Sequence, residues 1–169
     1  SWDSVRDWKD VKKEDPDAHV VGMHSILGIK NWEQGKEGWA WKARIVAGGH
    51  NVRDTLGTKV KNEDMFGDPV PLYALRLIVA KAIAEGHVVQ VADVDGAHLT
   101  APLKGPSCWA RVPKELRPAG WAEGIANPVV KLEKALYGLP RAGFDWYDHF
   151  RDILIKHGWN PVSGFDSIY

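Results

Sequence analysis

Cysteine is nearly absent from this sequence of 169 residues, in which Cys108 is the single one. A disulfide-stabilised scaffold is therefore excluded, because a bridge needs two cysteines. An excess of charge is also absent, since 22 Lys and Arg balance 22 Asp and Glu. This balance argues against bulk electrostatic attachment to nucleic acid or a membrane, but it leaves room for a local basic face. No apolar run reaches about 18 residues, so we expect no membrane-spanning helix.

Signatures of several common enzyme classes are missing as well. The sequence has no GxxxxGKS/T, GxGxxG, HExxH or CxxC pattern, so it lacks the usual phosphate-binding loops, zinc-binding helix and redox pair. The acidic turn 93–96 lacks the additional ligands and the distal glutamate of an EF-hand. Residue 1 is serine and Ser1-Trp2-Asp3 does not begin a signal peptide, so we expect the sequence to be part of a longer chain.

The remaining composition is that of a soluble globular domain. Hydrophobic residues make up 44% of the sequence and charged residues 26%, and a chain of this length can bury a core. Tryptophan is unusually frequent, with nine residues. Because a tryptophan carries a large apolar surface, we expect most of them in the core or at an interface.

Apolar periodicity predicts helices and strands in a mixed order. Trp2, Val5 and Trp8 recur at helical spacing before Pro16, which predicts a short amphipathic helix within residues 1–18. Further segments follow either the helical or the two-residue period. They predict strands at 20–30, 39–46, 87–94, 107–112 and 128–132, a strand beginning in 165–169, and helices at 72–85 and 141–157. This order indicates an α+β fold.

The two longer predicted helices each have an apolar stripe that we expect to face the core. Gly86 and Gly158 follow them and are suited to terminate a helix. The stripes consist of Leu72, Leu75, Val79, Ala82 and Ile83 in the first helix and Ala142, Trp146, Phe150, Ile153 and Leu154 in the second. Residues 47–71 have no clear periodicity and predict a long connection.

Two cations share one face of the strand predicted at 39–46. Residues 20–46 are typical of a β-hairpin, with a glycine-containing turn at 32–38. Side chains alternate along a strand, so Lys42 and Arg44 project from the same face. They form either a solvated sheet face or a clamp for an anion. We expect the opposite face to be packed; it carries Trp39, Trp41, Ala43 and Ile45.

Acidic side chains suggest two further candidate sites. Asp93 follows Val89 and Val91 at spacing two, so it is expected to end a buried strand, where a carboxylate is either a local turn cap or a ligand for Mg²⁺. A second group shares one face of the helix 141–157 and indicates either a solvated charged face or a metal site. This group consists of Asp145, Asp148, His149 and Asp152.

Several blocks of the sequence occur in the order found in one protein family. They are WKARIVAGGH at 41–50, EDMFGDPVPLYALRLIVAKAIAEG at 63–86, VVQVADVDGAHLTAPLKG at 88–105 and VVKLEKALYGLPRAGFDWYDHFRDILIKHGW at 129–159. Together they resemble the reverse transcriptase of Ty1/copia-type retrotransposons from about Val20 to Tyr169. The resemblance implies RNA-directed DNA synthesis by a two-metal mechanism. It also implies a fold with β-hairpin fingers over about 20–86 and part of a helix-packed antiparallel palm sheet over about 87–169, after an N-terminal segment, 1–19.

The resemblance assigns roles to individual residues. Asp93 matches the first catalytic, metal-binding aspartate of the palm, and Val94 would offer its backbone carbonyl to the same metal. Lys42 and Arg44 match cations of the fingers that meet the nucleotide triphosphate. His98 occupies the position under the nucleotide sugar.

A second group of matching residues is expected to shape the nucleotide and template pocket. It consists of Tyr137, Gly138, Leu139 and Arg141. The helix arginine of the family corresponds to Arg76, for which we expect a structural role.

The sequence departs from the family pattern near these positions. His98 replaces phenylalanine, Gly48 replaces an arginine, Pro140-Arg141 replaces Lys-Gln, and Gly143-Phe144 replaces Pro-Arg. The family's Y-V-D-D hairpin, with two further catalytic aspartates, is expected beyond residue 169, and Asp166 cannot substitute for it. We therefore expect these 169 residues alone not to polymerise DNA.

The resemblance also implies cofactors and partners. These are Mg²⁺ or Mn²⁺, an RNA template, a DNA primer and a deoxynucleoside triphosphate, with integrase and RNase H domains in the same polyprotein and an intracellular, cytoplasmic particle as location. A non-catalytic, retroelement-derived module that binds nucleic acid or protein is the alternative. An unrelated tryptophan-rich domain that binds carbohydrate is a third hypothesis.

Overall fold

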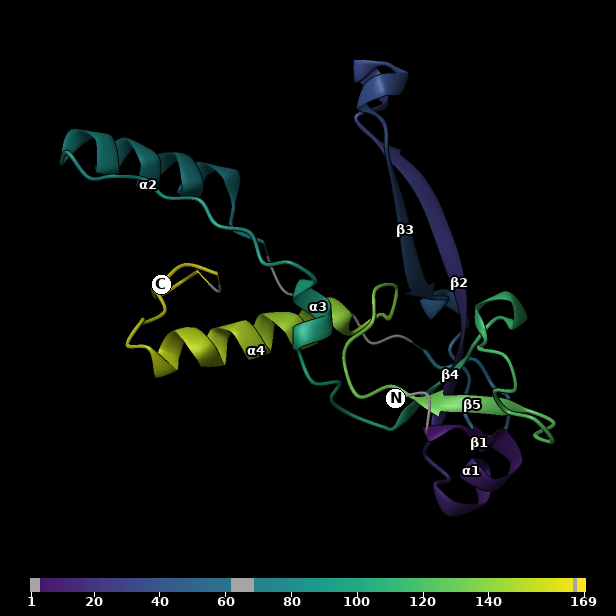
Figure 1. The fold of residues 1–169 in the computed structure, drawn as a ribbon. Coiled ribbons are helices and arrows are strands. Elements are labelled where there is room, and N and C mark those ends of the chain that lie inside the picture. Colours follow the sequence, from purple (N-terminus) through teal and green to yellow (C-terminus); the bar gives the residue numbers. More distant parts are fainter. Residues whose placement is uncertain (1–3, 62–68, 166) are drawn as a thin grey trace.

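The computed structural model describes residues 4–61, 69–165 and 167–169. Trp2 and Asp166, and part of the connection 47–71, lie outside these residues. Figure 1 shows a small sheet from which a long hairpin and two helices project. In chain order the elements are β1 (Arg6–Asp7), α1 (Trp8–Glu14), β2 (His19–Lys30), 3-10 turns at Trp32–Gln34 and Lys36–Gly38, β3 (Ala40–Ala47), a 3-10 turn at Gly49–Asn51, α2 (Leu72–Ala84), α3 (Ala97–Thr100), β4 (Cys108–Arg111), a 3-10 turn at Lys114–Leu116, β5 (Pro128–Lys131) and α4 (Ala142–Lys156).

The α+β class is as predicted, but the sheet is mixed rather than antiparallel. Its strand order is β1-β5-β4-β2-β3. The first part of β2 pairs in parallel with β4, from His19 opposite Cys108 to Gly22 opposite Arg111. The other pairings are antiparallel. A parallel pair needs a long crossover connection, and the chain between β2 and β4 is long enough to provide one.

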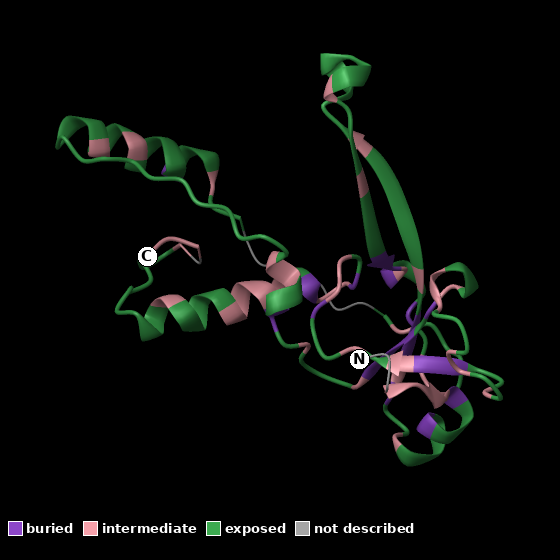
Figure 2. Ribbon diagram, in the orientation of Figure 1, coloured by how far each residue is buried: buried purple, intermediate pink, exposed green. Residues whose placement is uncertain are grey.

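The predicted hairpin is present, and its base alone is buried. β2 and β3 pair from Met23 opposite Ala47 to Lys30 opposite Ala40. Val46 and Ala47 are buried, whereas Leu27 and Trp41 are 66% and 67% exposed. Figure 2 shows the exposed arms rising above the buried base. The prediction that the face of Trp39, Trp41, Ala43 and Ile45 is packed is therefore wrong, because the arms extend beyond the rest of the sheet.

The N-terminal helix starts later than predicted. Arg6 and Asp7 pair with β5 as a short strand, so the helix begins at Trp8. The Asp7 carboxylate caps it by accepting a hydrogen bond of 2.8 Å from the Lys9 N–H. The helix ends at Glu14, before Pro16, as predicted. Its buried side chains form a small cluster with the sheet: Trp8, Val11, Ala18, Val20, Trp109 and Val129.

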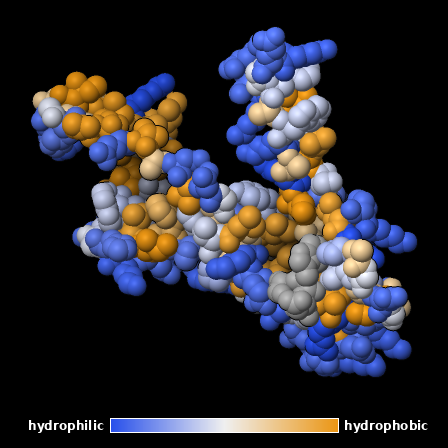
Figure 3. Space-filling view, viewed as in Figure 1, coloured by the Kyte–Doolittle hydropathy of each residue, from blue (hydrophilic) through white to orange (hydrophobic). Residues whose placement is uncertain are grey.

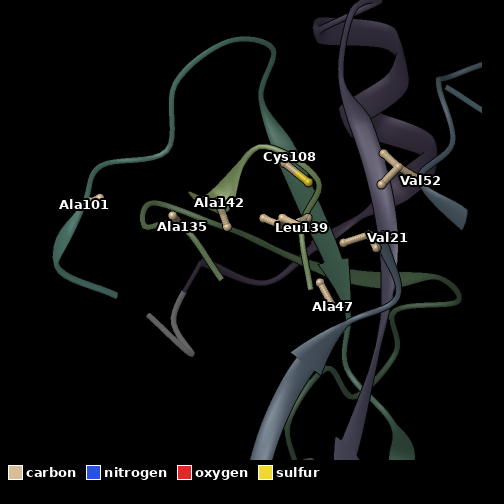
Figure 4. Packing of buried hydrophobic residues seen from close by; sticks show 8 residues of the cluster. All are labelled: Val21, Ala47, Val52, Ala101, Cys108, Ala135, Leu139 and Ala142. Carbon is tan, nitrogen blue, oxygen red and sulfur yellow. The ribbon is translucent and has the colours of Figure 1, made fainter. Parts of the chain in front are cut away.

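A second cluster joins the hairpin base to the segment before α4. Figure 4 shows Leu139 in its middle, with Val21 and Ala47 on one side and Ala142 on the other. The cluster consists of Val21, Ala47, Val52, Ala101, Cys108, Ala135, Leu139 and Ala142. Of the tryptophans, Trp8 and Trp109 are buried, while Trp32, Trp41 and Trp159 are more than half exposed. The sequence predicts most tryptophans in the core or at an interface, and among the described residues the core holds only these two buried ones.

The strand predicted at 87–94 is not formed. These residues have no regular secondary structure and pair with no described strand, and Val88 and Val91 are 85% and 96% exposed. A β-strand needs a neighbour for its backbone N–H and C=O groups, which apolar alternation alone does not supply. The prediction that Asp93 ends a buried strand is therefore wrong. The strand predicted to begin in 165–169 is also absent from its described residues.

The helices α2 and α4 have nearly the predicted bounds, but their apolar stripes are largely exposed. Leu72, Leu75 and Ile83 of α2 are exposed, and Figure 3 shows apolar side chains over the outside of this helix. In α4, Ala142 is buried, whereas Phe150 and Ile153 are exposed. Periodicity predicted the helices correctly, but the packing of their stripes depends on contacts that the described residues do not make. Among the described helices, none is both long and apolar enough to cross a membrane.

Candidate functional site

The hairpin places three cations on one face. In the register of β2 and β3, Lys42 lies opposite Gly28, Arg44 opposite Ile26 and Lys30 opposite Ala40. Directly opposed residues share a face, so Lys30, Lys42 and Arg44 project together. The charge of Arg44 is the main cause that lowers the pKa of Lys42, with further contributions from Lys30, while Asp95 acts in the opposite direction. This cationic face therefore concentrates positive charge beside one acidic turn.

Lys30 is the member of the cationic face that sequence reasoning missed. Alternation along strand 39–46 pairs Lys42 with Arg44, but it gives no information about the neighbouring strand. Lys30 joins them because the turn at 31–39 sets the register at Lys30 opposite Ala40. The type and length of this turn fix the register of the hairpin, so identifying them in the sequence would have predicted that Lys30 lies on the face of Lys42 and Arg44.

The acidic turn is exposed and close to the cationic face. Asp93, Val94 and Asp95 are all exposed, and Gly96, with a φ of 62°, directly precedes the short helix α3. Asp95 lies near enough to Lys42 to raise its pKa in part. Within the described ranges, no group of three or more His, Cys, Asp and Glu side chains could hold a metal ion.

His98 and Tyr137, which the resemblance places in one pocket, are in contact. Their ring centroids lie 4.7 Å apart in an edge-to-face arrangement, a favourable geometry for aromatic rings. The buried Nδ1 atom of His98 has no hydrogen-bond partner among the described residues. An unpaired buried polar atom is costly, so the Nδ1 side of this ring is not stabilised by a hydrogen bond, and the ring contact with Tyr137 helps to hold it.

The segment 136–139 forms a turn that fits against the base of the hairpin. Leu139 N–H donates to the Leu136 carbonyl at 3.1 Å, and Ala47 N–H donates to the Tyr137 carbonyl at 2.7 Å. Gly138 has a φ of 89°, a backbone conformation that favours glycine. A Cβ atom at Gly138 would overlap the Ala47 carbonyl oxygen. The turn therefore fixes Tyr137 relative to β3.

Arg141 is engaged in a buried ion pair. Its guanidinium donates to both carboxylate oxygens of Asp145, at 2.9 to 3.1 Å. The Lys104 backbone N–H donates to the same carboxylate at 3.3 Å, and the Lys104 ammonium pairs with Asp148. Asp145 is fully buried, so the prediction that it lies on a solvated face or a metal site is wrong. The spacing of Arg141 and Asp145, four residues apart, is the signal that could have shown this pair.

Arg141 also lines a cavity of about 280 Å³ between the β2–β4 region and the turn 136–139. Lys61 and Lys104 contribute charge to its wall, and Cys108 and Leu139 contribute apolar surface. Gly105 permits this placement of Arg141, because a Cβ atom there would overlap the guanidinium.

Comparison with known proteins identifies one family that this chain matches. Residues 6–169 match the family described as "Reverse transcriptase (RNA-dependent DNA polymerase)". The chain belongs to this family. It is 28% identical over 170 residues to the Transposon Ty1-ER2, Ty1-MR2 and Ty1-H Gag-Pol polyproteins of Saccharomyces cerevisiae, and the alignments cover 100% of this chain.

The chain spans 8% of the length of these polyproteins. No solved structure matches it significantly. Membership of the reverse transcriptase family over nearly the whole chain supports a fragment of a copia-type reverse transcriptase and does not favour a non-catalytic module. It also leaves the carbohydrate-binding hypothesis without support.

Proposed function

We propose that this chain supplies the fingers, over about residues 20–86, and the first part of the palm, over about 87–169, of an RNA-directed DNA polymerase within a longer Gag-Pol-type polyprotein. The observation that carries the proposal is the family match over residues 6–169. The cationic face of the hairpin supports it, because phosphoryl transfer depends on cations that bind the phosphates of the nucleotide.

Lys42 and Arg44 bind the triphosphate of the incoming deoxynucleotide. Their mutual repulsion lowers the pKa of Lys42, and a bound polyanion would relieve this repulsion. The primer 3′-hydroxyl attacks the α-phosphate, forming the new phosphodiester bond as pyrophosphate leaves. The ammonium of Lys42 and the guanidinium of Arg44 thereby bind the phosphate oxygens and position them for the transfer.

The acidic turn has the chemistry for Mg²⁺ or Mn²⁺. Asp93 offers an exposed carboxylate and Val94 a backbone carbonyl, and Mg²⁺ commonly binds one or two carboxylates while waters and substrate phosphates complete its shell. When bound, the ion would offset negative charge on the phosphate oxygens.

His98 and Tyr137 form the wall next to the sugar of the nucleotide. Their edge-to-face contact joins α3 to the turn 136–139. That turn is bonded to Ala47 at the hairpin base. Gly138 and Leu139 therefore shape the pocket by fixing the position of Tyr137. Arg141 does not contact the nucleotide in this proposal; its ion pair with Asp145 holds the neighbouring segments in place.

The partners follow from the family. We propose an RNA template, a DNA primer and a deoxynucleoside triphosphate as ligands, integrase and RNase H as neighbouring domains, and a cytoplasmic particle as location. The relatives are Gag-Pol polyproteins of which this chain matches 8%. We therefore assign the polymerase activity to the longer polyprotein and expect none from residues 1–169 alone.

Nucleotide binding by the parent reverse transcriptase tests the proposal. We expect Lys42→Ala to weaken the apparent Kd for the deoxynucleotide about tenfold, the effect of losing one charged hydrogen bond. Lys36→Ala is the matched control, because it removes the same charge from the hairpin turn outside the cationic face. Unchanged affinity in Lys42→Ala, or equal loss in both variants, would contradict the proposal.

A further inference from the structure

A second concentration of positive charge lies at the opposite end of the sheet from the hairpin tip. A groove of about 320 Å³ runs between α1 and the turn 53–57. Figure 1 shows α1 at one end of the sheet, with the hairpin projecting from the other. Four cations line the groove: Lys9, Lys12, Arg53 and Arg111. We call this feature the α1 groove.

The fold brings these four cations together from separate segments. Lys9 and Lys12 are three residues apart on α1, so they lie on one side of the helix. Arg53 is held beside β2 by backbone hydrogen bonds in both directions with Val20, at 2.8 and 2.9 Å. Arg111 lies opposite Gly22 in β4, on the same face as the buried Trp109.

The acids in and next to α1 each have a hydrogen-bond or ion-pair partner. The backbone hydrogen bond from Lys9 and, to a smaller extent, the charge of Lys9 contribute to lowering the pKa of Asp7. Asp7 accepts hydrogen bonds from the Lys9 and Asn127 backbone N–H groups. Asp10 pairs with Lys13, Glu14 pairs with Arg6, and Asp15 accepts a hydrogen bond from the Ser107 hydroxyl.

Asp54 is the acid that lines the groove itself, and one of its oxygens is occupied by the backbone. It accepts from Leu56 N–H at 2.9 Å and from Thr58 N–H at 2.8 Å. Lys9, Lys12, Arg53 and Arg111 form no ion pair within 4.0 Å with a carboxylate in the described part of the chain. In a chain of zero net charge, this is a marked local excess of positive charge.

We propose that the α1 groove binds the sugar-phosphate backbone of a single-stranded nucleic acid, at a contact separate from the nucleotide site. Long basic side chains that converge on an open groove suit phosphates, which need charge but no apolar pocket. Of the apolar side chains that line the groove, Trp8 and Val20 are buried and Leu56 is exposed, so the four cations outnumber the exposed apolar side chains that a peptide could contact. The family is described as an RNA-dependent DNA polymerase, and a nucleic acid is the ligand consistent with that activity. The choice of ligand therefore rests on the proposed function.

Salt dependence of RNA binding by the full 169-residue chain tests this inference. The probe is a fluorescently labelled polyuridine oligonucleotide, and fluorescence anisotropy gives its affinity at several salt concentrations. Each phosphate contact on a single strand contributes about 0.7 to the slope of log K against log salt. We expect Lys12→Gln to reduce the slope by about 0.7, Arg111→Gln to do the same, and the double variant to reduce it by about 1.4.

Lys13→Gln is the matched control. It removes the same charge from the neighbouring position of α1, but Lys13 pairs with Asp10 and does not line the groove. An equal effect of Lys12→Gln and Lys13→Gln, or an unchanged slope in both groove variants with native circular dichroism, overturns the inference. Lys42→Ala separates this outcome from that of the proposed function, because it alters the nucleotide site and leaves the α1 groove intact.

Discussion

Arg141 and Asp145, four residues apart at the start of α4, form a two-pronged ion pair in which the carboxylate is fully buried. The Asp145 carboxylate also accepts a hydrogen bond from the Lys104 backbone N–H, so the pair connects α4 to the segment that follows α3. Arg141 compensates a charge that water cannot reach. Its role in the pocket is therefore to hold the surrounding segments in place.

Removal of Arg141 is expected to destabilise the chain strongly. Arg141→Met leaves the Asp145 carboxylate buried without its cation, which costs about 3 kcal/mol of unfolding free energy in comparable pairs. Urea denaturation followed by circular dichroism measures the loss. The double variant Arg141→Met with Asp145→Leu is the control, and we expect it to recover most of the stability because no unpaired charge remains. A loss below about 1 kcal/mol in the single variant contradicts a buried pair.

Two glycines near α4 should respond in opposite directions to alanine. Gly138→Ala forces a φ of 89° on a residue with a Cβ atom that would overlap Ala47, which costs at least about 1 to 2 kcal/mol. Gly143→Ala, inside α4, meets no neighbouring atom within 4 Å and should stabilise by about 0.5 to 1 kcal/mol. Thermal unfolding of both variants measures these changes. Similar unfolding midpoints for the two variants would contradict the claim that the close approach of Gly138 to Ala47 requires glycine.

Local periodicity was enough to predict the hairpin and the helices α2 and α4. Lys42 and Arg44 could be placed on one face because alternation along a strand is a local property. The strand at 87–94 could not be predicted in the same way, because pairing depends on a neighbour elsewhere in the chain.

Burial was predicted less well than secondary structure. Asp145 belongs to a polar helix face in the sequence, and only the approach of Lys104 and Arg141 shows that it is buried. Leu72 and Trp41 show the opposite difference: both belong to apolar patterns that predict burial, and both are exposed. The apolar pattern therefore correctly predicted a helix and a strand at these positions. It could not predict whether another segment packs against them, because that depends on residues far away in the sequence.

Alkaline pH is expected to destabilise the chain through Cys108. Burial raises the pKa of its thiol from an ordinary value of 9.0 to about 12. Between these values the unfolded chain loses the thiol proton while the folded chain keeps it, so the unfolding free energy falls as the pH rises from about 9 toward 12. Urea titrations across this range, compared with Cys108→Ala, measure the contribution. A pH dependence that is identical in the two proteins would show that Cys108 does not cause it.

Replacement of His98 by phenylalanine is expected to stabilise the fold. The Nδ1 atom of His98 is buried without a hydrogen-bond partner in the described structure, and such an atom typically costs about 1 to 3 kcal/mol. Phenylalanine removes the polar atom and can keep the edge-to-face contact with Tyr137. His98→Ala is the control, because it removes the polar atom and the ring contact together. We expect a higher unfolding midpoint for His98→Phe than for the unmodified chain and a lower one for His98→Ala. If His98→Phe instead unfolds at a lower temperature, the imidazole makes a contribution that its ring contact with Tyr137 does not explain.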